Sequence, residues 1–102
     1  MIKVSVVYEN KPGEFDMNYY CTQHIPMVKH RLGTACKRVE VDQGIAGVQP
    51  GSAPPFIAQA HFLFDSVEAF QQAFGPHAGA IMADIPNYTT LSPIIWLNEV
   101  KL

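Results

Sequence analysis

FIAQAHFLF, residues 56–64, is the stretch of sequence that decides the fold. Its alternation places apolar side chains on one face of a β-strand and a mixed set on the other. The apolar face carries Phe56, Ala58, Ala60, Phe62 and Phe64, and the mixed face carries Ile57, Gln59, His61 and Leu63. A wholly apolar strand face is typical of a sheet that lies under helices. The mixed face is too apolar for water, so we expect a second copy of the chain to cover it.

Three more strands are expected around this one. Alternating apolar residues predict strands over residues 2–9 and 36–44, and SPIIWLNEVKL, residues 92–102, predicts the last strand. Helical periodicity is present in residues 15–32 and again in residues 65–84. The order β-α-β-β-α-β predicts a ferredoxin-like α+β fold, in which two helices cover one face of a four-stranded antiparallel sheet.

Composition limits the chain to a single domain and a short list of functions. The 102 residues are 48% apolar and 16% charged, which is typical of one globular domain over residues 1–102. A net charge of −2 without a Lys or Arg cluster argues against nucleic-acid binding. We also expect no membrane span and no signal peptide, and we assign the chain to the cytoplasm with its two cysteines reduced.

The first helical stretch, FDMNYYCTQHIPM (residues 15–27), combines ordinary helix signals with one unusual feature. Asp16 has the character of an N-cap, and Phe15 and Tyr20 have the spacing of a hydrophobic staple. His24 shares the face of Tyr20, on a stripe expected to face the core with Met17, Cys21, Met27 and Val28. Pro26 predicts a kink or break that opens space beside His24. His24 is therefore either a hydrogen-bonded core residue or a group that transfers protons.

The remaining candidates come from other parts of the chain. We predict His24, His61 and Tyr20 as catalytic residues. The expected ligand-binding residues are Tyr19, Gln59, His77, Asn87, Tyr88 and Trp96. Gln59 and His61 are expected to line a pocket between two facing sheets. Each candidate also has a structural explanation: an interface residue for His61, a solvent-facing residue for His77, a helix-to-strand connection for Asn87 and Tyr88, and packing for Trp96.

The sequence has no motif for a metal ion or an organic cofactor. Its histidines do not follow the H-x-x-x-H spacing of a metal-binding helix. It has neither a glycine-rich nucleotide loop nor a G-x-S-x-G elbow. We therefore expect no metal and no cofactor, so that any chemistry would depend on His, Tyr and Asn side chains.

Three segments together resemble the EthD family: FDMNYY…HIPMV, FDSVEAF and IMADIPNYT. The resemblance extends from Val4 to Val100, and Pro26-Met27 stands where the family has Pro-Leu. It implies a dimeric α+β barrel of ferredoxin-like protomers. It also implies a link to ethyl tert-butyl ether degradation beside a cytochrome P450 oxygenase system, with a loosely oxidoreductase-related role. Relatives by fold include cofactor-free polyketide cyclases, quinol monooxygenases and muconolactone isomerases.

Three functions are consistent with these observations. The favoured one is a homodimer that binds a small apolar or aromatic metabolite and moves a proton during cyclisation, isomerisation, dehydration or cofactor-free oxygenation. The second is a non-catalytic carrier or accessory protein for an oxygenase. The third is a stable dimer in which every histidine is structural.

Overall fold

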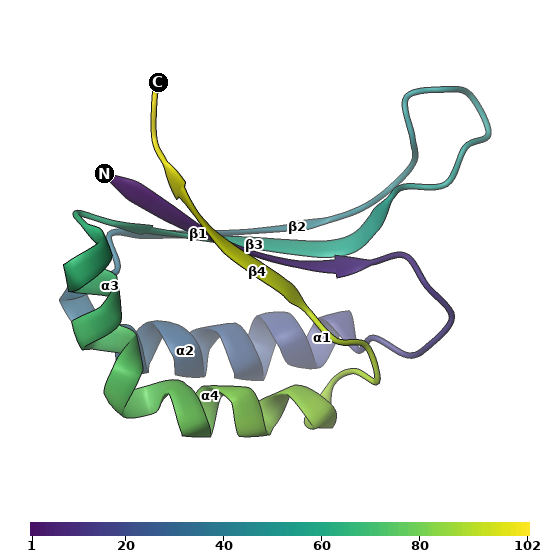
Figure 1. The fold of residues 1–102 in the computed structure, drawn as a ribbon. Coiled ribbons are helices and arrows are strands. Elements are labelled where there is room, and N and C mark those ends of the chain that lie inside the picture. Colours follow the sequence, from purple (N-terminus) through teal and green to yellow (C-terminus); the bar gives the residue numbers. More distant parts are fainter.

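A computed structural model describes residues 1–102 as a layer of helices on one face of a four-stranded sheet (Figure 1). The strands are β1 (Ile2–Glu9), β2 (Arg38–Gln43), β3 (Phe56–Phe64) and β4 (Ile94–Glu99). All neighbouring strands are antiparallel, in the order β2-β3-β1-β4. The predicted ferredoxin-like α+β fold is thereby confirmed.

Two helical regions run below the sheet, and the opposite face has no helix over it (Figure 1). The first region contains α1 (Met17–Tyr19), the π-helical segment η1 (Tyr20–His24), α2 (Ile25–Leu32) and the 3₁₀ turn η2 (Gly33–Ala35). The second contains α3 (Val67–Phe74), the 3₁₀ turn η3 (Gly75–His77), α4 (Ala78–Asp84) and the 3₁₀ turn η4 (Ile85–Asn87). None of these helices combines the length and the apolar character that crossing a membrane requires.

The start of the first helical region follows the predicted signals. The Asp16 carboxylate accepts a hydrogen bond from the Tyr19 backbone N–H at 2.9 Å, as an N-cap does. The Phe15 and Tyr20 rings lie 5.0 Å apart in an edge-to-face contact, which is the predicted staple. Gly33 ends α2 with a φ of 65°, a conformation that favours glycine.

The helix does not break at Pro26, so the predicted break is wrong, although the helix is irregular just before this residue and a cavity does lie beside His24. The chain passes instead through the wider turn of η1, where the Ile25 N–H donates to the Tyr20 carbonyl five residues earlier. Pro26 is then the second residue of α2, where a missing N–H costs little. The extra residue in η1 also turns Cys21 outward to an exposed position, which corrects its place on the core-facing stripe. The residues of this region that are buried are Tyr20, His24, Ile25, Val28 and Leu32.

Strand β3 alternates as its sequence predicts. Four residues of one face are buried under the helices, and the three between them are only partly covered: Ala58, Ala60, Phe62 and Phe64 on the first, and Gln59, His61 and Leu63 on the second. The register places Tyr8 opposite Ala58 on the helix-covered face and Ser5 opposite His61 on the uncovered face. The sheet therefore separates His61 from everything that lies beneath the helices.

Candidate functional site

A cavity of about 240 Å³ lies between the sheet and the helices. Seventeen residues line it, and sixteen of them are hydrophobic. Its aromatic wall consists of Tyr8, Tyr20, Phe62, Phe64, Phe70 and Phe74. His24 is the exception among the lining residues, and no Lys, Arg, Asp or Glu reaches the wall. The cavity wall therefore has no permanently charged side chain, and it contains one group that can exchange a proton near neutral pH.

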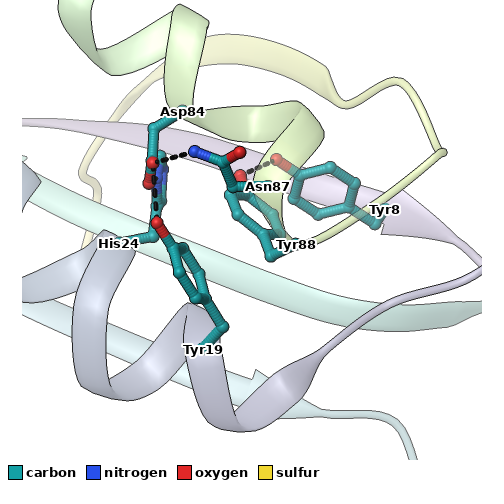
Figure 2. Close-up of polar contacts among 6 residues, drawn as sticks. All are labelled: Tyr8, Tyr19, His24, Asp84, Asn87 and Tyr88. Atoms are coloured by element: carbon teal, nitrogen blue, oxygen red, sulfur yellow. Dashed lines mark hydrogen bonds and ion pairs between the residues drawn. The ribbon is translucent and has the colours of Figure 1, made fainter.

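His24 is the last residue of η1, and its ring is fixed on three sides. The imidazole Nδ1 lies 2.8 Å from Oδ2 of Asp84, the last residue of α4 (Figure 2). The ring stacks on Tyr20 at a centroid distance of 5.6 Å and packs against Tyr88 at 4.6 Å. The side chain is only 6% exposed. These contacts join the two helical regions at a single histidine.

Asp84 is itself fixed by two further donors. The Tyr19 hydroxyl donates to Oδ1 at 2.8 Å, and Asn87 Nδ2 donates to the same oxygen at 2.9 Å (Figure 2). Burial alone would raise the pKa of Asp84, but the hydrogen bonds from Asn87, His24 and Tyr19 outweigh it and hold the pKa below its ordinary value. Asp84 is thus ionised at neutral pH and accepts a hydrogen bond from Nδ1–H of His24.

The same arrangement sets the protonation state of His24. Burial lowers the pKa of His24 from its ordinary value, and the hydrogen bond and charge of Asp84 only partly offset this. The ring is therefore neutral at pH near 7, with its proton on Nδ1 and a lone pair on Nε2. No buried side-chain N or O lacks a hydrogen-bond partner, yet Nε2 has no partner in the protein. Nε2 must border open space, and the cavity is the open space that His24 lines.

Two tyrosine hydroxyls lie near this histidine. Tyr20 is 1% exposed, and burial raises its pKa far above the ordinary value, so its hydroxyl stays protonated. This hydroxyl also has no partner in the protein, and by the same reasoning it opens onto the cavity. The Tyr8 and Tyr88 hydroxyls bond to each other at 2.6 Å, and burial raises the pKa of both (Figure 2). The cavity thus combines a proton acceptor with at least one hydrogen-bond donor.

The structure brings five of the predicted site residues together. His24 and Tyr20 line the cavity, and Tyr19, Asn87 and Tyr88 surround the His24–Asp84 pair without lining the cavity themselves. Asn87 and Tyr88 were expected to contact a ligand. In the structure Asn87 contacts Asp84, and Tyr88 contacts Tyr8 and the His24 ring.

The other four candidates lie elsewhere. Gln59, His61 and Trp96 are on the uncovered face of the sheet, because each alternates with residues that face the helices. His77 lies beside Arg31, whose Nη1 is 3.3 Å from His77 Nδ1, and it does not line the cavity. His24 and His61 are thus on opposite sides of one sheet and cannot act on one ligand within one chain.

A polar chain on the uncovered face accounts for the contacts of His61. Its Nδ1 lies 2.9 Å from Oγ of Ser5, which also accepts from Asn98 Nδ2 at 2.9 Å. Trp96 Nε1 in turn donates to Asn98 Oδ1 at 2.7 Å. The predicted pocket between two sheets involves a second copy of the chain and stays a prediction.

Two residues of the site were not predicted from the sequence. Asp84 ends the second helical stretch, and nothing in the spacing of residues sixty positions apart indicates that it meets His24. Tyr8 carried a signal that was not used: alternation along β1 places it with Val4 and Val6 on the face under the helices. No three His, Cys, Asp or Glu side chains lie close enough together to hold a metal ion.

A ferredoxin-like α+β sheet with an apolar cavity under its helices defines the class of this protein, and its architecture is consistent with the dimeric α+β barrel fold. Within that class the chain belongs to the EthD family, because the model of the EthD domain matches residues 12–92. No protein of curated function matches the sequence significantly.

Solved structures agree with this assignment. An EthD-like protein from Ralstonia eutropha JMP134 is 43% identical with a TM-score of 0.94, and the match covers 99% of this chain and 92% of that one. An ethyl tert-butyl ether (EthD) family protein from Bacillus halodurans C-125 is 20% identical with a TM-score of 0.67, covering 99% of both chains. HapK from Hahella chejuensis is 14% identical with a TM-score of 0.61, covering 99% of this chain and 93% of that one. The last two share the fold alone.

Proposed function

We propose that this chain is a cofactor-independent enzyme that binds a small apolar or aromatic metabolite under its helices and transfers a proton through His24. The observation that carries the proposal is the His24–Asp84 pair, with Nδ1 and Oδ2 2.8 Å apart, at the edge of a cavity whose other lining residues are hydrophobic. A core histidine needs no ionised partner to be buried. An ionised carboxylate held by three donors is, however, the arrangement that fixes an imidazole as a base.

The chemistry follows from the tautomer. Asp84 holds the proton on Nδ1, so Nε2 accepts a proton from a bound molecule. The imidazolium formed in this way is stabilised by Asp84, and it returns the proton at a second atom of the substrate. Cyclisation, isomerisation and dehydration all require this pair of steps. His61 has no part in them, because it lies on the other face of the sheet.

We propose a homodimer that forms through the uncovered face of the sheet. Ile94 and Trp96 of β4 are 44% and 41% exposed on that face, and Ile57 and Leu63 of β3 are partly buried on the same face. A second copy would cover these side chains. The family's link to ethyl tert-butyl ether degradation makes ether or xenobiotic breakdown beside an oxygenase the setting that we propose for the activity.

Turnover by matched variants tests the catalytic role. Wild type, His24→Gln, Asp84→Asn and the control His30→Gln are incubated with small phenols, lactones and enolisable ketones, and products are followed by NMR. His30 is exposed on α2 and belongs to no site. We expect activity to fall by about 10²–10⁴-fold in His24→Gln and to persist in His30→Gln. Equal turnover by folded His24→Gln and wild type would remove His24 from the chemistry.

A second candidate function is a carrier, and the nearly complete apolar lining favours it. A carrier needs the cavity but not the His24–Asp84 pair. It predicts that a ligand copurifies unchanged and that Asp84→Asn retains the same ligand at the same occupancy. The enzymatic reading predicts product instead, and loss of product formation in Asp84→Asn.

A further inference from the structure

The substrate class can be narrowed by what the cavity wall offers and what it lacks. No Lys or Arg lines the cavity, and the carboxylate of Asp84 lies directly behind His24. A substrate carboxylate in this space would be buried without a counter-charge and close to a like charge, which is strongly unfavourable compared with leaving it in water. Anionic acids are therefore excluded, and the occupant is a neutral molecule.

Size sets a second limit. A dry apolar cavity of roughly 150 Å³ holds one benzene molecule. The cavity here is about 240 Å³, which suits one or two fused rings or an equivalent branched molecule. The aromatic side chains on its wall, among them Phe64, Phe70 and Phe74, favour a flat, partly unsaturated ligand.

The two open polar atoms set the third limit. Nε2 of His24 accepts a proton and the Tyr20 hydroxyl donates a hydrogen bond, and the two rings are stacked at a centroid distance of 5.6 Å. A molecule that satisfies both must present an acidic hydrogen beside a hydrogen-bond acceptor. An enolisable carbonyl compound has this pattern, with an acidic C–H on the carbon next to the C=O.

We propose that the substrate is a neutral, apolar enolisable ketone or lactone, with His24 as base and Tyr20 as hydrogen-bond donor to the carbonyl oxygen. This inference rests on the proposed function and narrows it. Nε2 of His24 removes the α-proton, and the C–H electron pair becomes the C=C bond of an enolate. The carbonyl π electrons move onto oxygen, where the Tyr20 hydroxyl stabilises the negative charge. In a substrate with a β,γ C=C bond the enolate is a conjugated dienolate, and return of the proton from His24 to its γ-carbon completes an isomerisation.

Solvent exchange at an α-carbon tests the step. 2-Tetralone, a neutral fused-ring ketone, is incubated with the protein in D₂O, and loss of its α-proton signals is followed by NMR. We expect wild type and His30→Gln to accelerate the loss and folded His24→Gln to give the buffer rate. Tyr20→Phe keeps the buried ring, so it tests the donor without removing the packing. We expect it to slow exchange by about 10²-fold or more, as loss of one oxyanion donor does.

Binding of three probe molecules tests the substrate class separately from the proposed function on which it rests. The probes are 2-naphthol, which has the shape of the enol, naphthalene, which lacks the oxygen, and 2-naphthoate, which carries a charge. Calorimetry should give the tightest binding for 2-naphthol, weaker binding for naphthalene and none for 2-naphthoate. Tyr20→Phe should weaken 2-naphthol about 5- to 10-fold and leave naphthalene unchanged, as loss of one hydrogen bond predicts.

Three outcomes would overturn the inference. One is binding of 2-naphthoate as tight as that of 2-naphthol. Another is that wild type exchanges the α-protons of 2-tetralone no faster than buffer does, or no faster than Tyr20→Phe does. If 2-naphthol still binds in a manner that depends on His24, these results reject the substrate class and leave the proposed function standing. The third is that neither neutral probe binds to the folded protein, which rejects both.

Discussion

His24 combines two environments that usually occur apart. Burial lowers its pKa, as for a core histidine, while Asp84 holds its proton on Nδ1, as for a catalytic one. The carboxylate keeps its charge because Tyr19 and Asn87 donate to it as well as His24. The pair is therefore a neutral imidazole on an ionised carboxylate at neutral pH, and it becomes a full ion pair only when His24 accepts a proton.

The free energy of unfolding should depend on pH because of this environment of His24. A histidine whose folded pKa is lowered below 6.5 takes up a proton on unfolding, so acid favours the unfolded state. The free energy of unfolding, from urea titrations, should thus fall as the pH drops from about 7 to about 5, by at most about 1.4 kcal/mol per pH unit for this group. Asp84, with its lowered pKa, adds a further loss at lower pH as its carboxylate is protonated.

His24→Gln should reduce the loss of stability between about pH 7 and about pH 5. His30→Gln is the control and should keep the wild-type dependence, because His30 is exposed and bonded to no acid. A wild-type dependence in His24→Gln would mean that the folded protein does not resist protonation of His24.

Among the secondary-structure elements, the π-helical segment η1 is the one that carries Tyr20 and His24 into the site. An α-helix through the same residues would put Cys21 on the core side together with Val28, whereas η1 leaves Cys21 exposed while Tyr20 and His24 stay buried. Pro26 indicated an irregularity at this point, but its sequence position alone could not separate a break from a widened turn. Packing of Tyr20 against Phe15 and Tyr8 favours the turn that keeps the ring buried.

Two helix caps allow the effect of the first helical region on ligand binding to be separated from its effect on the stability of the fold. Asp16 caps the helix that leads into the site, and Ser66 caps α3, where its hydroxyl accepts from the Ala69 N–H at 3.1 Å. Each change to Ala should cost about 1 kcal/mol, which corresponds to a fall in melting temperature of about 4–8 °C. Only Asp16→Ala should also weaken 2-naphthol binding, because it loosens the turn that carries Tyr19 and Tyr20. Equal binding losses in the two variants would tie the effect to stability alone.

At the scale of the whole molecule, alternation in β3 was enough to predict which face of the sheet the helices cover. The order of the elements then fixed the topology, and the caps and the staple fixed the start of the first helix. The site was predictable only in part. His24 and Tyr20 lie in one helical stretch, so their proximity is local, whereas Asp84 and Tyr8 reach them only through the tertiary fold. A pairing of this kind leaves no periodicity for a single sequence to reveal.

The uncovered sheet face gives a prediction for the assembly. Trp96→Glu places a charge on the face where we propose that a second copy packs, and Val48→Asp makes a comparable change on the β2–β3 loop, where Val48 is fully exposed. Sedimentation should give a dimer for wild type and Val48→Asp and a monomer for Trp96→Glu, because an unpaired charge at a buried interface is costly. A dimeric, folded Trp96→Glu protein would place the interface elsewhere.

The state of the His24 ring is the most direct test of the account. In protein labelled with ¹⁵N-histidine at neutral pH, NMR distinguishes a protonated ring nitrogen from one with a free lone pair. We predict a proton on Nδ1 of His24, a lone pair on Nε2, and a shift of the Nε2 signal when 2-naphthol is added. Asp84→Asn should remove this preference. A proton on Nε2 in the wild type, or an Nε2 signal that saturating 2-naphthol leaves unchanged, would contradict the assignment of His24 as the base of an apolar site.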